Sequence, residues 1–499
     1  MNASRLCVLL ALLLCFPLSA RPQSPEKIAI DLNAKGTPFP HYWEQSFGSG
    51  RAILSLRESY RNDLREVKKV ADLRYVRFHA IFHDELGVYD EDENGNPEFN
   101  FTYIGQVYDG LLQNGVRPFV ELSFMPKKLA SRQDLHPFWY KQVVAPPKDY
   151  AKWDLLIRNF AQFLIDRYGI DEVSQWYFEV WNEPNIDFWS GDPKQATYFE
   201  LYDHTAHALK SVNPRLRVGG PSTSSAHWVD EFLAHVAKEN VPIDFASTHG
   251  YSDDTVEDLF DTHDVIPVEQ RACKAVQKVH NQVLASPFPH LPLFWTEWNV
   301  ASYGPLNARD TSYSATATAQ TIHDCDGMLD ILSLWTFSDV FEEGGPVQAP
   351  FPAIFGLLAP GGVKKPSYYA FSLFHKLGDI RLAAPAENVL VTRRENGAIV
   401  IAIWNLSPPD QPGTARSFEL DFSGLHGSPD TLLSRIDSTH GNTLAAYQRI
   451  GSPRYPTLEQ IKQINSESAL PPPEHIQIGA GRLTLQVPVN GLALIEFQP

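Results

Sequence analysis

The sequence predicts an α/β protein: a (β/α)8 TIM barrel joined to a smaller C-terminal β-sandwich domain. Between about residues 41 and 377, short apolar runs alternate with amphipathic stretches of helical spacing, the pattern of repeated strand-helix units. Eight such runs can be placed, and eight units close naturally into a barrel. Beyond about residue 378 the helical spacing stops and short alternating runs follow, as is typical of a sandwich.

The eight candidate barrel strands are short runs rich in aliphatic and aromatic residues. In chain order they are Trp43–Phe47, Arg74–Phe78, Arg117–Leu122, Trp176–Trp181, Leu216–Gly219, Phe245–His249, Leu293–Glu297 and Ile331–Trp335. The clearest helix between them has apolar residues at helical spacing: Trp153, Leu156, Phe160, Phe163 and Tyr168. Gly169 follows directly and is placed to end that helix.

The amino-terminal end has the layout of a secretory signal peptide over residues 1–20. A single cation, Arg5, precedes an apolar run over Leu6–Phe16, and a small residue, Ala20, precedes a polar stretch. We therefore expect a secreted or periplasmic protein that leaves no part in the membrane after cleavage. Residues 21–40 contain one candidate strand, Lys27–Leu32, which we assign to the sandwich.

Residues 378–499 are predicted to form the sandwich, and residues 41–377 the barrel. Five alternating runs share short length and turn residues between them: Val389–Arg394, Ile399–Trp404, Ser417–Phe422, Arg482–Val487 and Leu492–Phe497. Between the first two runs, Glu395-Asn396-Gly397 predicts a hairpin turn.

Charge and cysteine content narrow the function. The formal net charge is −17, so a nucleic acid would be repelled and a neutral substrate fits better. Only Cys273 and Cys325 lie outside the predicted signal peptide, too few for a disulfide scaffold. Two buried free thiols are one outcome, and a single bridge in an exported protein is the other.

In a TIM barrel the active site lies at the carboxyl ends of the strands, so the polar and aromatic residues there are the candidates. They are Arg77, His79, Glu121, Asn182, Glu183, His249, Tyr251, Glu297, Trp335, Asp339 and Glu342. No paired His or Cys spacing indicates a metal site, and no glycine-rich turn follows the first strand. We therefore predict no metal and no cofactor.

Two carboxylates stand out because each directly follows an aromatic-rich strand. Glu183 follows the fourth strand and Glu297 ends the seventh. Glycoside cleavage needs one group that protonates the departing oxygen and a second carboxylate that meets the developing positive charge on the anomeric carbon. Carboxyls about 5–5.5 Å apart give retention, whereas about 6.5–9.5 Å leaves room for a water and gives inversion.

Ordered motifs along the barrel resemble glycoside hydrolase family 39, the β-xylosidases and their α-L-iduronidase relatives, within the clan of retaining TIM-barrel glycosidases. The matching segments are Trp181-Asn182-Glu183-Pro184-Asn185, Arg77-Phe78-His79, Arg117–Glu121, Phe124–Ala130, Val218–Pro221 and Trp335–Glu343. The match departs from the usual pattern at Phe78, Thr248 and Trp295. These departures concern the sugar more than the mechanism.

The resemblance implies roles for the candidates. Glu183 would be the general acid/base, with its pKa raised by burial and by the charge of Glu297, the nucleophile. Asn182 would bind the substrate 2-hydroxyl, and Arg77 would hold Glu297 ionised. His79, His249, Tyr251 and Glu342 would orient hydroxyls or carboxylates, Trp335 would form a stacking floor, and Glu121 would be either a substrate contact or a support.

The predicted function is a retaining exo-glycosidase acting on an oligosaccharide or glycoside, most simply a β-xylosidase acting on xylo-oligosaccharides. One rival is the same mechanism on another sugar: an α-L-iduronide, β-glucoside, β-galactoside or arabinoside. A uronic acid would require a cationic clamp, for which Lys127, Lys128 and Arg77 are the candidates. The other rival is a non-catalytic carbohydrate-binding protein. Family relatives are often oligomeric, so the resemblance leaves a homo-oligomer open.

Overall fold

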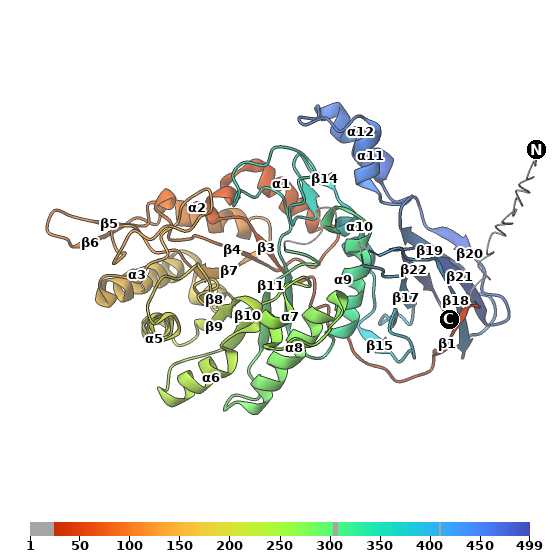
Figure 1. The fold of residues 1–499 in the computed structure, drawn as a ribbon, viewed down its shortest axis with the longest axis horizontal. Coiled ribbons are helices and arrows are strands. Elements are labelled where there is room, and N and C mark those ends of the chain that lie inside the picture. Colours follow the sequence, from red (N-terminus) through yellow and green to blue (C-terminus); the bar gives the residue numbers. More distant parts are fainter. Residues whose placement is uncertain (1–23, 303–307, 409–410) are drawn as a thin grey trace, which may run out of the picture.

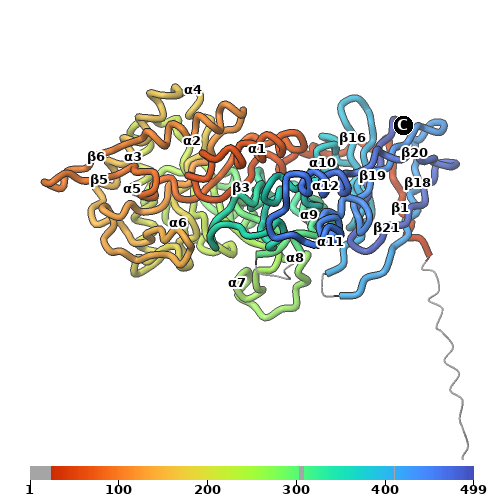
Figure 2. Tube along the Cα trace, turned by 90° about the horizontal axis from the view of Figure 1, so that it is seen from above, coloured from red at the N-terminus to blue at the C-terminus, as the bar shows by residue number. Residues whose placement is uncertain are grey.

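A computed structural model describes residues 24–302, 308–408 and 411–499. The helix-covered barrel forms one end of the molecule and the sheets of the C-terminal region form the other (Figures 1 and 2). The predicted signal peptide, residues 1–20, lies outside the described residues. No helix in the part of the chain that the structure describes is long and apolar enough to cross a membrane.

The barrel is closed by eight parallel strands, which confirms the predicted fold class. They are β3 (Ser46–Ser49), β4 (Tyr75–Phe78), β7 (Arg117–Leu122), β8 (Tyr177–Val180), β9 (Arg217–Thr223), β10 (Phe245–His249), β11 (Leu293–Trp298) and β12 (Ile331–Leu334). Each overlaps one predicted strand. The first strand begins three residues later than predicted, because Trp43 lies in a turn and is buried by packing against Phe39 and Tyr42.

Helices cover the outside of the barrel. They are α1 (Glu58–Val67), α2 (Thr102–Leu112), α3 (Tyr150–Tyr168), α4 (Ile170–Val173), α5 (Lys194–Val212), α6 (Val229–Lys238), α7 (Val256–Phe260), α8 (Val268–Ala285), α9 (Tyr313–Asp324) and α10 (Pro366–Phe374). The Asp149 carboxylate caps α3 by accepting from the amides of Ala151 and Lys152. Gly169, at φ 80°, ends this helix as the sequence predicts.

Two short antiparallel pairs extend from the loops of the barrel. The first joins β5 (Tyr89–Glu91) to β6 (Pro97–Phe99) and projects beyond α2 and α3 (Figure 1). The second joins β13 (Leu358–Ala359) to β14 (Val363–Lys364) in the long connection that follows β12. Along the chain, this second pair lies between the last barrel strand, β12, and the helix α10.

The C-terminal region packs two sheets around an apolar layer. The larger sheet has the order β2 (Thr37–Pro38), β15 (Ile380–Leu382), β16 (Val389–Arg393), β17 (Ile399–Trp404), β22 (Leu492–Phe497), β19 (Thr431–Ile436) and β20 (Glu474–Ile476). The smaller sheet has the order β1 (Glu26–Asp31), β18 (Arg416–Ser423) and β21 (Arg482–Val487). Ile30 and Phe418 from the smaller sheet share one core with Ile401 and Ile495 from the larger.

Six elements of this region have no counterpart in the sequence prediction: the strands β2, β15, β19 and β20 and the helices α11 (Thr443–Arg449) and α12 (Leu458–Ser468). The two helices bury their own small cluster against β13 and β14, with Ile464 and Ala446 at its centre. β1 pairs in parallel with β18, far along the chain. The boundaries proposed at residues 40 and 378 stay predictions.

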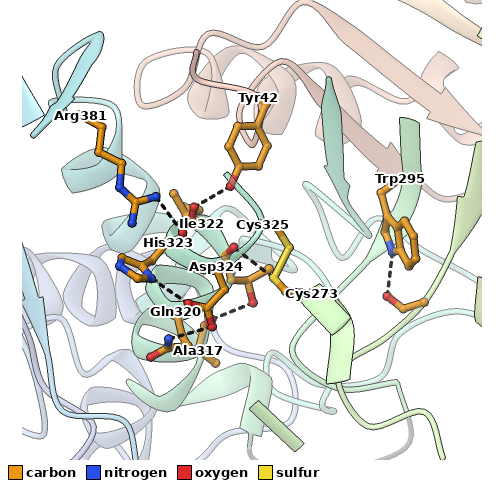
Figure 3. Close-up of a disulfide and its surroundings, with 12 residues drawn as sticks. Tyr42, Cys273, Trp295, Ala317, Gln320, Ile322, His323, Asp324, Cys325 and Arg381 are labelled. Atoms are coloured by element: carbon orange, nitrogen blue, oxygen red, sulfur yellow. Dashed lines mark hydrogen bonds and ion pairs between the residues drawn. A yellow bond between two sulfur atoms is a disulfide. The ribbon is translucent and has the colours of Figure 1, made fainter. Parts of the chain in front are cut away.

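A disulfide joins Cys273 of α8 to Cys325, which follows α9, so of the two outcomes left open for these cysteines the structure has the bridge (Figure 3). The last turn of α9 also accepts hydrogen bonds from two distant residues. Tyr42 donates to the Ile322 carbonyl at 2.6 Å, and Arg381 of β15 donates to the His323 carbonyl at 2.9 Å. The carboxyl end of α9 therefore ties barrel and sandwich together.

Candidate active site

A cavity of about 760 Å³ opens at the carboxyl ends of the barrel strands. Six residues predicted from the sequence line it: His79, Asn182, Glu183, Tyr251, Glu297 and Trp335. Three others, Arg77, Glu121 and His249, are fully buried behind this lining. A larger cavity of about 940 Å³ between barrel and sandwich, lined by Asp324 and Arg381 among others, contains none of these side chains. The first cavity is therefore the candidate active site.

Arg77, which projects from β4, is the hub of the buried network behind the cavity. Its Nε donates to Glu179 Oε2 at 2.6 Å and its Nη1 to Glu297 Oε1 at 2.6 Å. Its Nη2 lies 2.8 Å from Glu121 Oε2 and 3.0 Å from Asn182 Oδ1. One guanidinium thus meets three carboxylates in a dry interior, which fixes their positions because any of them unpaired would carry a large desolvation cost.

Glu183 reaches the cavity through a sharp backbone turn after β8. Trp181 and Glu183 adopt positive φ angles of 72° and 43°, a region that side-chain-bearing residues rarely occupy. The Glu183 amide donates to the Ser222 carbonyl at 2.8 Å, and the Trp181 indole donates to the Phe188 carbonyl at 2.8 Å. These bonds hold the strained turn in place and point the Glu183 carboxyl into the cavity.

The two strand-end carboxylates face each other. An oxygen of Glu183, a ring nitrogen of His249 and an oxygen of Glu297 all lie within 4.8 Å of one another. His249 Nδ1 is 3.1 Å from Glu183 Oε1 and 3.8 Å from Glu297 Oε1. Burial lowers the pKa of His249 to about 4, so this imidazole is neutral at neutral pH and adds no charge between the carboxylates.

The two carboxylates sit in different surroundings. Burial raises the pKa of Glu183 to about 7, against the opposing charges of His79 and Arg77. The charge of Glu297, which the sequence analysis expected to contribute, is not among the leading causes. Glu297 instead is held in ion-pair and hydrogen-bond contacts: Arg77 binds Oε1, and the Tyr251 hydroxyl donates to Oε2 at 2.9 Å. One carboxyl suits a proton donor and the other an ionised nucleophile.

His79 and Trp335 form the inner wall of the cavity. Their ring centroids are 4.6 Å apart, and Trp335 packs so tightly on β3 that a Cβ at Gly48 would come within 2.0 Å of its ring. Burial would lower the pKa of His79, but the charge of Glu121 and its 2.7 Å hydrogen bond to Nδ1 outweigh burial and raise it. Glu121 thus supports His79 and Arg77 from behind rather than lining the cavity.

The sequence selected the wrong one of two adjacent glutamates. Glu342 does not line the cavity, because its carboxylate pairs with Arg57 Nη1 at 2.6 Å and Arg51 Nη1 at 2.8 Å. Glu343 lines it instead, with Oε1 3.8 Å from His79 Nε2, and burial raises the pKa of Glu343 to about 8. Glu343, and not the predicted Glu342, is therefore the glutamate of this pair that lines the cavity.

Comparison with known proteins decides the family. The sequence model described as "Glycosyl hydrolases family 39" matches residues 26–475. The chain belongs to glycosyl hydrolase family 39. It is 37% identical over 474 residues to a β-xylosidase from Geobacillus stearothermophilus, covering 92% of this chain and 93% of that protein.

Two solved structures resemble this family 39 chain over nearly their whole length. The crystal structure of a monomeric β-xylosidase from Caulobacter crescentus CB15 has a TM-score of 0.84 and 34% identity, covering 95% of this chain and 99% of that one. The family 39 enzyme from Xanthomonas axonopodis pv. citri has a TM-score of 0.85 and 31% identity, covering 97% and 99%.

Among the described residues of this family 39 chain, two groups have the spacing of metal ligands: His79, Glu121 and Glu297, and Glu183, His249 and Glu297. Both share Glu297, whose Oε1 already accepts from Arg77. A divalent cation in either group would lie close to that buried guanidinium, and the two like charges would repel. The donor sets therefore suit proton transfer better than metal binding, and the absence of a metal from the reaction stays a prediction.

Two further acidic residues belong to this family 39 site. Glu179, two residues before Trp181, is a structural partner: it binds Arg77 and accepts from Thr296 at 2.8 Å. Asp254, in the loop between β10 and α7, lines the cavity, and burial raises its pKa to about 7. No sequence signal marked Asp254, because loop residues show neither the helical spacing nor the strand alternation used to place the elements.

Proposed function

We propose that this family 39 chain is a retaining β-xylosidase that releases a terminal xylose by double displacement, with Glu183 as acid/base and Glu297 as nucleophile. One observation carries the mechanism: carboxylate oxygens of Glu183 and Glu297 lie within 4.8 Å of each other. That limit on the nearest oxygen pair favours the separation of about 5–5.5 Å used by retaining enzymes over the about 6.5–9.5 Å used by inverting ones. Exo action follows from the assignment as a β-xylosidase.

In the first step the Glu297 carboxylate attacks the anomeric carbon as the glycosidic C–O bond breaks. The proton of Glu183 passes to the departing oxygen, so the leaving group departs as a neutral alcohol. Arg77 and Tyr251 bind the two oxygens of Glu297 and align them before the attack. A pKa of about 7 leaves a substantial fraction of Glu183 protonated near neutral pH, which supports its role as the acid.

In the second step the Glu183 carboxylate removes a proton from water, and the water oxygen attacks the anomeric carbon. The ester bond to Glu297 breaks, its carboxylate is regenerated, and xylose leaves with its original anomeric configuration. Asn182 lines the cavity beside Glu183, with its Oδ1 held by Arg77. We assign it to the sugar 2-hydroxyl.

The charges of the cavity favour a neutral sugar over a uronic acid. Lys128 pairs with the exposed Asp90, and neither it nor Lys127 lines the cavity. Arg77 is buried behind the lining and occupied by three carboxylates. Arg309 does line the cavity, but its guanidinium already donates to the carbonyls of Ala301, Ser302 and Ala353, so the iduronide alternative has no cation available as a clamp among the described lining residues.

The proposal is tested with aryl glycosides, led by the β-xyloside, while the released anomer is followed by NMR. Wild type should release β-xylose first, Glu297→Ala should lose turnover, and Glu183→Ala should be slowed most for poor leaving groups. If another glycoside is cleaved with retention instead, the roles of Glu183 and Glu297 stand and the assignment of xylose as the sugar is wrong. Inversion would overturn the retaining mechanism. Binding of the sugar with no cleavage by wild type would favour a binding protein instead.

We also propose that the chain is exported. The layout of residues 1–20 supports a signal peptide, and the Cys273–Cys325 bridge supports an oxidising compartment. Amino-terminal sequencing of the protein recovered from the periplasm or medium should give Arg21 first. Recovery only from the cytoplasm with Met1 retained would contradict export. A homo-oligomer stays a prediction, which light scattering of the purified protein tests.

A further inference from the structure

Part of the cavity lining is apolar, and these residues are called the outer chamber: Ile186, Phe138, Phe188, Val347, Ile354 and Phe355. Ile186 follows Glu183 closely, donates its amide to the Glu183 carbonyl at 3.2 Å, and is 38% exposed. Phe188 and Phe138 also line the cavity, and their ring centroids are 5.3 Å apart. Because the departing oxygen must reach Glu183, a leaving group lies against the side chains next to that residue.

The outer chamber also takes apolar residues from the long connection after β12, namely Val347, Ile354 and Phe355. A buried cation holds this segment: Lys365 Nζ donates to the Ile354 carbonyl at 2.8 Å and lies 2.6 Å from Asp339 Oδ2. Asp339 Oδ1 in turn accepts from the Gly356 amide at 2.6 Å, so the wall is anchored on both sides of Phe355.

Several polar side chains that line the cavity outside the predicted site already have partners. Arg309 donates to the carbonyls of Ala301, Ser302 and Ala353. Asp254 accepts from the Tyr251 amide at 2.9 Å and from Ser225 at 3.3 Å.

Two further polar groups of the chamber are engaged in the same way. The Gln348 side chain accepts from Arg454, and the Ser224 side chain bonds Glu183. A second xylose unit in this chamber would bury hydroxyls with few free partners, and an unsatisfied buried hydroxyl is costly.

We infer that the leaving-group side of the cavity selects a hydrophobic alcohol or phenol, so that the preferred substrates are β-xylosides of apolar aglycones rather than xylo-oligosaccharides. This inference rests on the proposed function and names its substrate class. The cavity volume of about 760 Å³ falls in the range of sites for ligands of drug-like size, larger than one pyranose ring needs.

The test compares kcat/KM for ethyl β-xyloside, 2-phenylethyl β-xyloside and xylobiose with the full chain. The two alkyl leaving groups have similar basicity, so their ratio reports binding of the phenyl ring rather than ease of departure. We expect the phenylethyl compound to exceed the ethyl compound about tenfold or more and to exceed xylobiose. Xylobiose cleaved faster than the phenylethyl compound overturns the inference and leaves the proposed function standing. Failure to cleave all three overturns the proposed function and the inference with it.

A matched pair of variants locates the effect. Ile186→Asn should lower the phenylethyl-to-ethyl ratio on the order of fivefold, because it replaces apolar contact area beside Glu183. Leu284→Asn makes the same kind of change on α8, at a residue that is 51% exposed and outside the cavity, and should leave the ratio unchanged. The ratio is independent of the fraction of folded enzyme. An unchanged ratio in Ile186→Asn would contradict the placement of the aglycone.

Discussion

The two ends of the barrel interior differ in chemistry although the same strands build both. At the amino-terminal end, Phe119, Phe245, Phe294 and Ile331 form an apolar cluster closed by Tyr75 and Tyr177. Phe245 and Phe294 stack there with ring centroids 4.9 Å apart. At the carboxyl end the interior is charged, with three carboxylates around Arg77 at 2.6–2.8 Å.

The change from one chemistry to the other takes two residues along a strand. On β4 it runs from Tyr75 to Arg77, and on β7 from Phe119 to Glu121. Residues two apart point to the same side of a strand, so each pair contributes one side chain to the apolar plug and one to the charged layer above it. The plug stabilises the barrel and the charged layer carries the chemistry.

Replacing Arg77 should give the largest effect, because it removes the hub of the charged layer. In Arg77→Leu the three carboxylates lose their shared partner, so the free energy of unfolding should fall by about 3–5 kcal/mol. kcat should fall on the order of 10²–10³-fold in the fraction that stays folded. Urea unfolding and active-site-normalised kinetics measure both. Arg77→Lys, which keeps one charge, serves as the control, and wild-type kcat in Arg77→Leu would refute the assigned role.

Replacing Phe245 should affect stability alone, which sharpens the contrast between the ends. Phe245→Ala opens a cavity in the apolar plug and should lower the free energy of unfolding by about 3–5 kcal/mol. kcat/KM of the folded fraction should stay within about twofold, because the plug lies two or more residues below the charged layer. Denaturant unfolding and kinetics on one preparation test this, and a large loss of kcat in folded protein would show that the two layers are coupled.

The pH dependence tests the charged layer directly. Glu183 must carry its proton to act as an acid, and its pKa is raised to about 7. kcat/KM for an alkyl xyloside should therefore fall as the pH rises through about 7, approaching tenfold per pH unit. Glu183→Gln, assayed on a dinitrophenyl xyloside that needs no acid, should lack this alkaline limb. A limb that persists in that variant would assign the titration to another group.

The smallest effect is expected from the adjacent glutamates, whose roles differ. Glu343 has a pKa of about 8, so at pH 6 it carries a proton and Glu343→Gln should change kcat/KM by less than about threefold. Glu342→Gln weakens the contacts with Arg51 and Arg57 and should lower the free energy of unfolding by about 1–3 kcal/mol. Measuring kcat/KM and thermal unfolding of both variants at pH 6 separates the two roles. A loss of kcat/KM in Glu342→Gln together with a loss of stability in Glu343→Gln would contradict this assignment.

Much of the fold could be predicted because it follows from local patterns. The alternation of apolar runs and helical spacing located all eight barrel strands, and Gly169 marked the end of α3. β19, α11 and α12 were missed because they lie in a stretch whose short elements have weak periodicity. The pairing of β1 with β18 depends on contacts almost four hundred residues apart, which set no local pattern.

The sequence by itself determined that polar residues gather at the strand ends and that Glu183 and Glu297 are the paired carboxylates to consider. The tertiary structure decided which side chains reach the cavity. A register shift between Thr248 and His249 sets His249 opposite Glu297, and another between Trp295 and Trp298 interrupts the regular pairing of β11 where it carries Glu297. Glu342 and Glu343 lie in the connection after β12, outside any strand or helix, so only the packed barrel could distinguish them, and only contacts between distant segments could join Cys273 to Cys325.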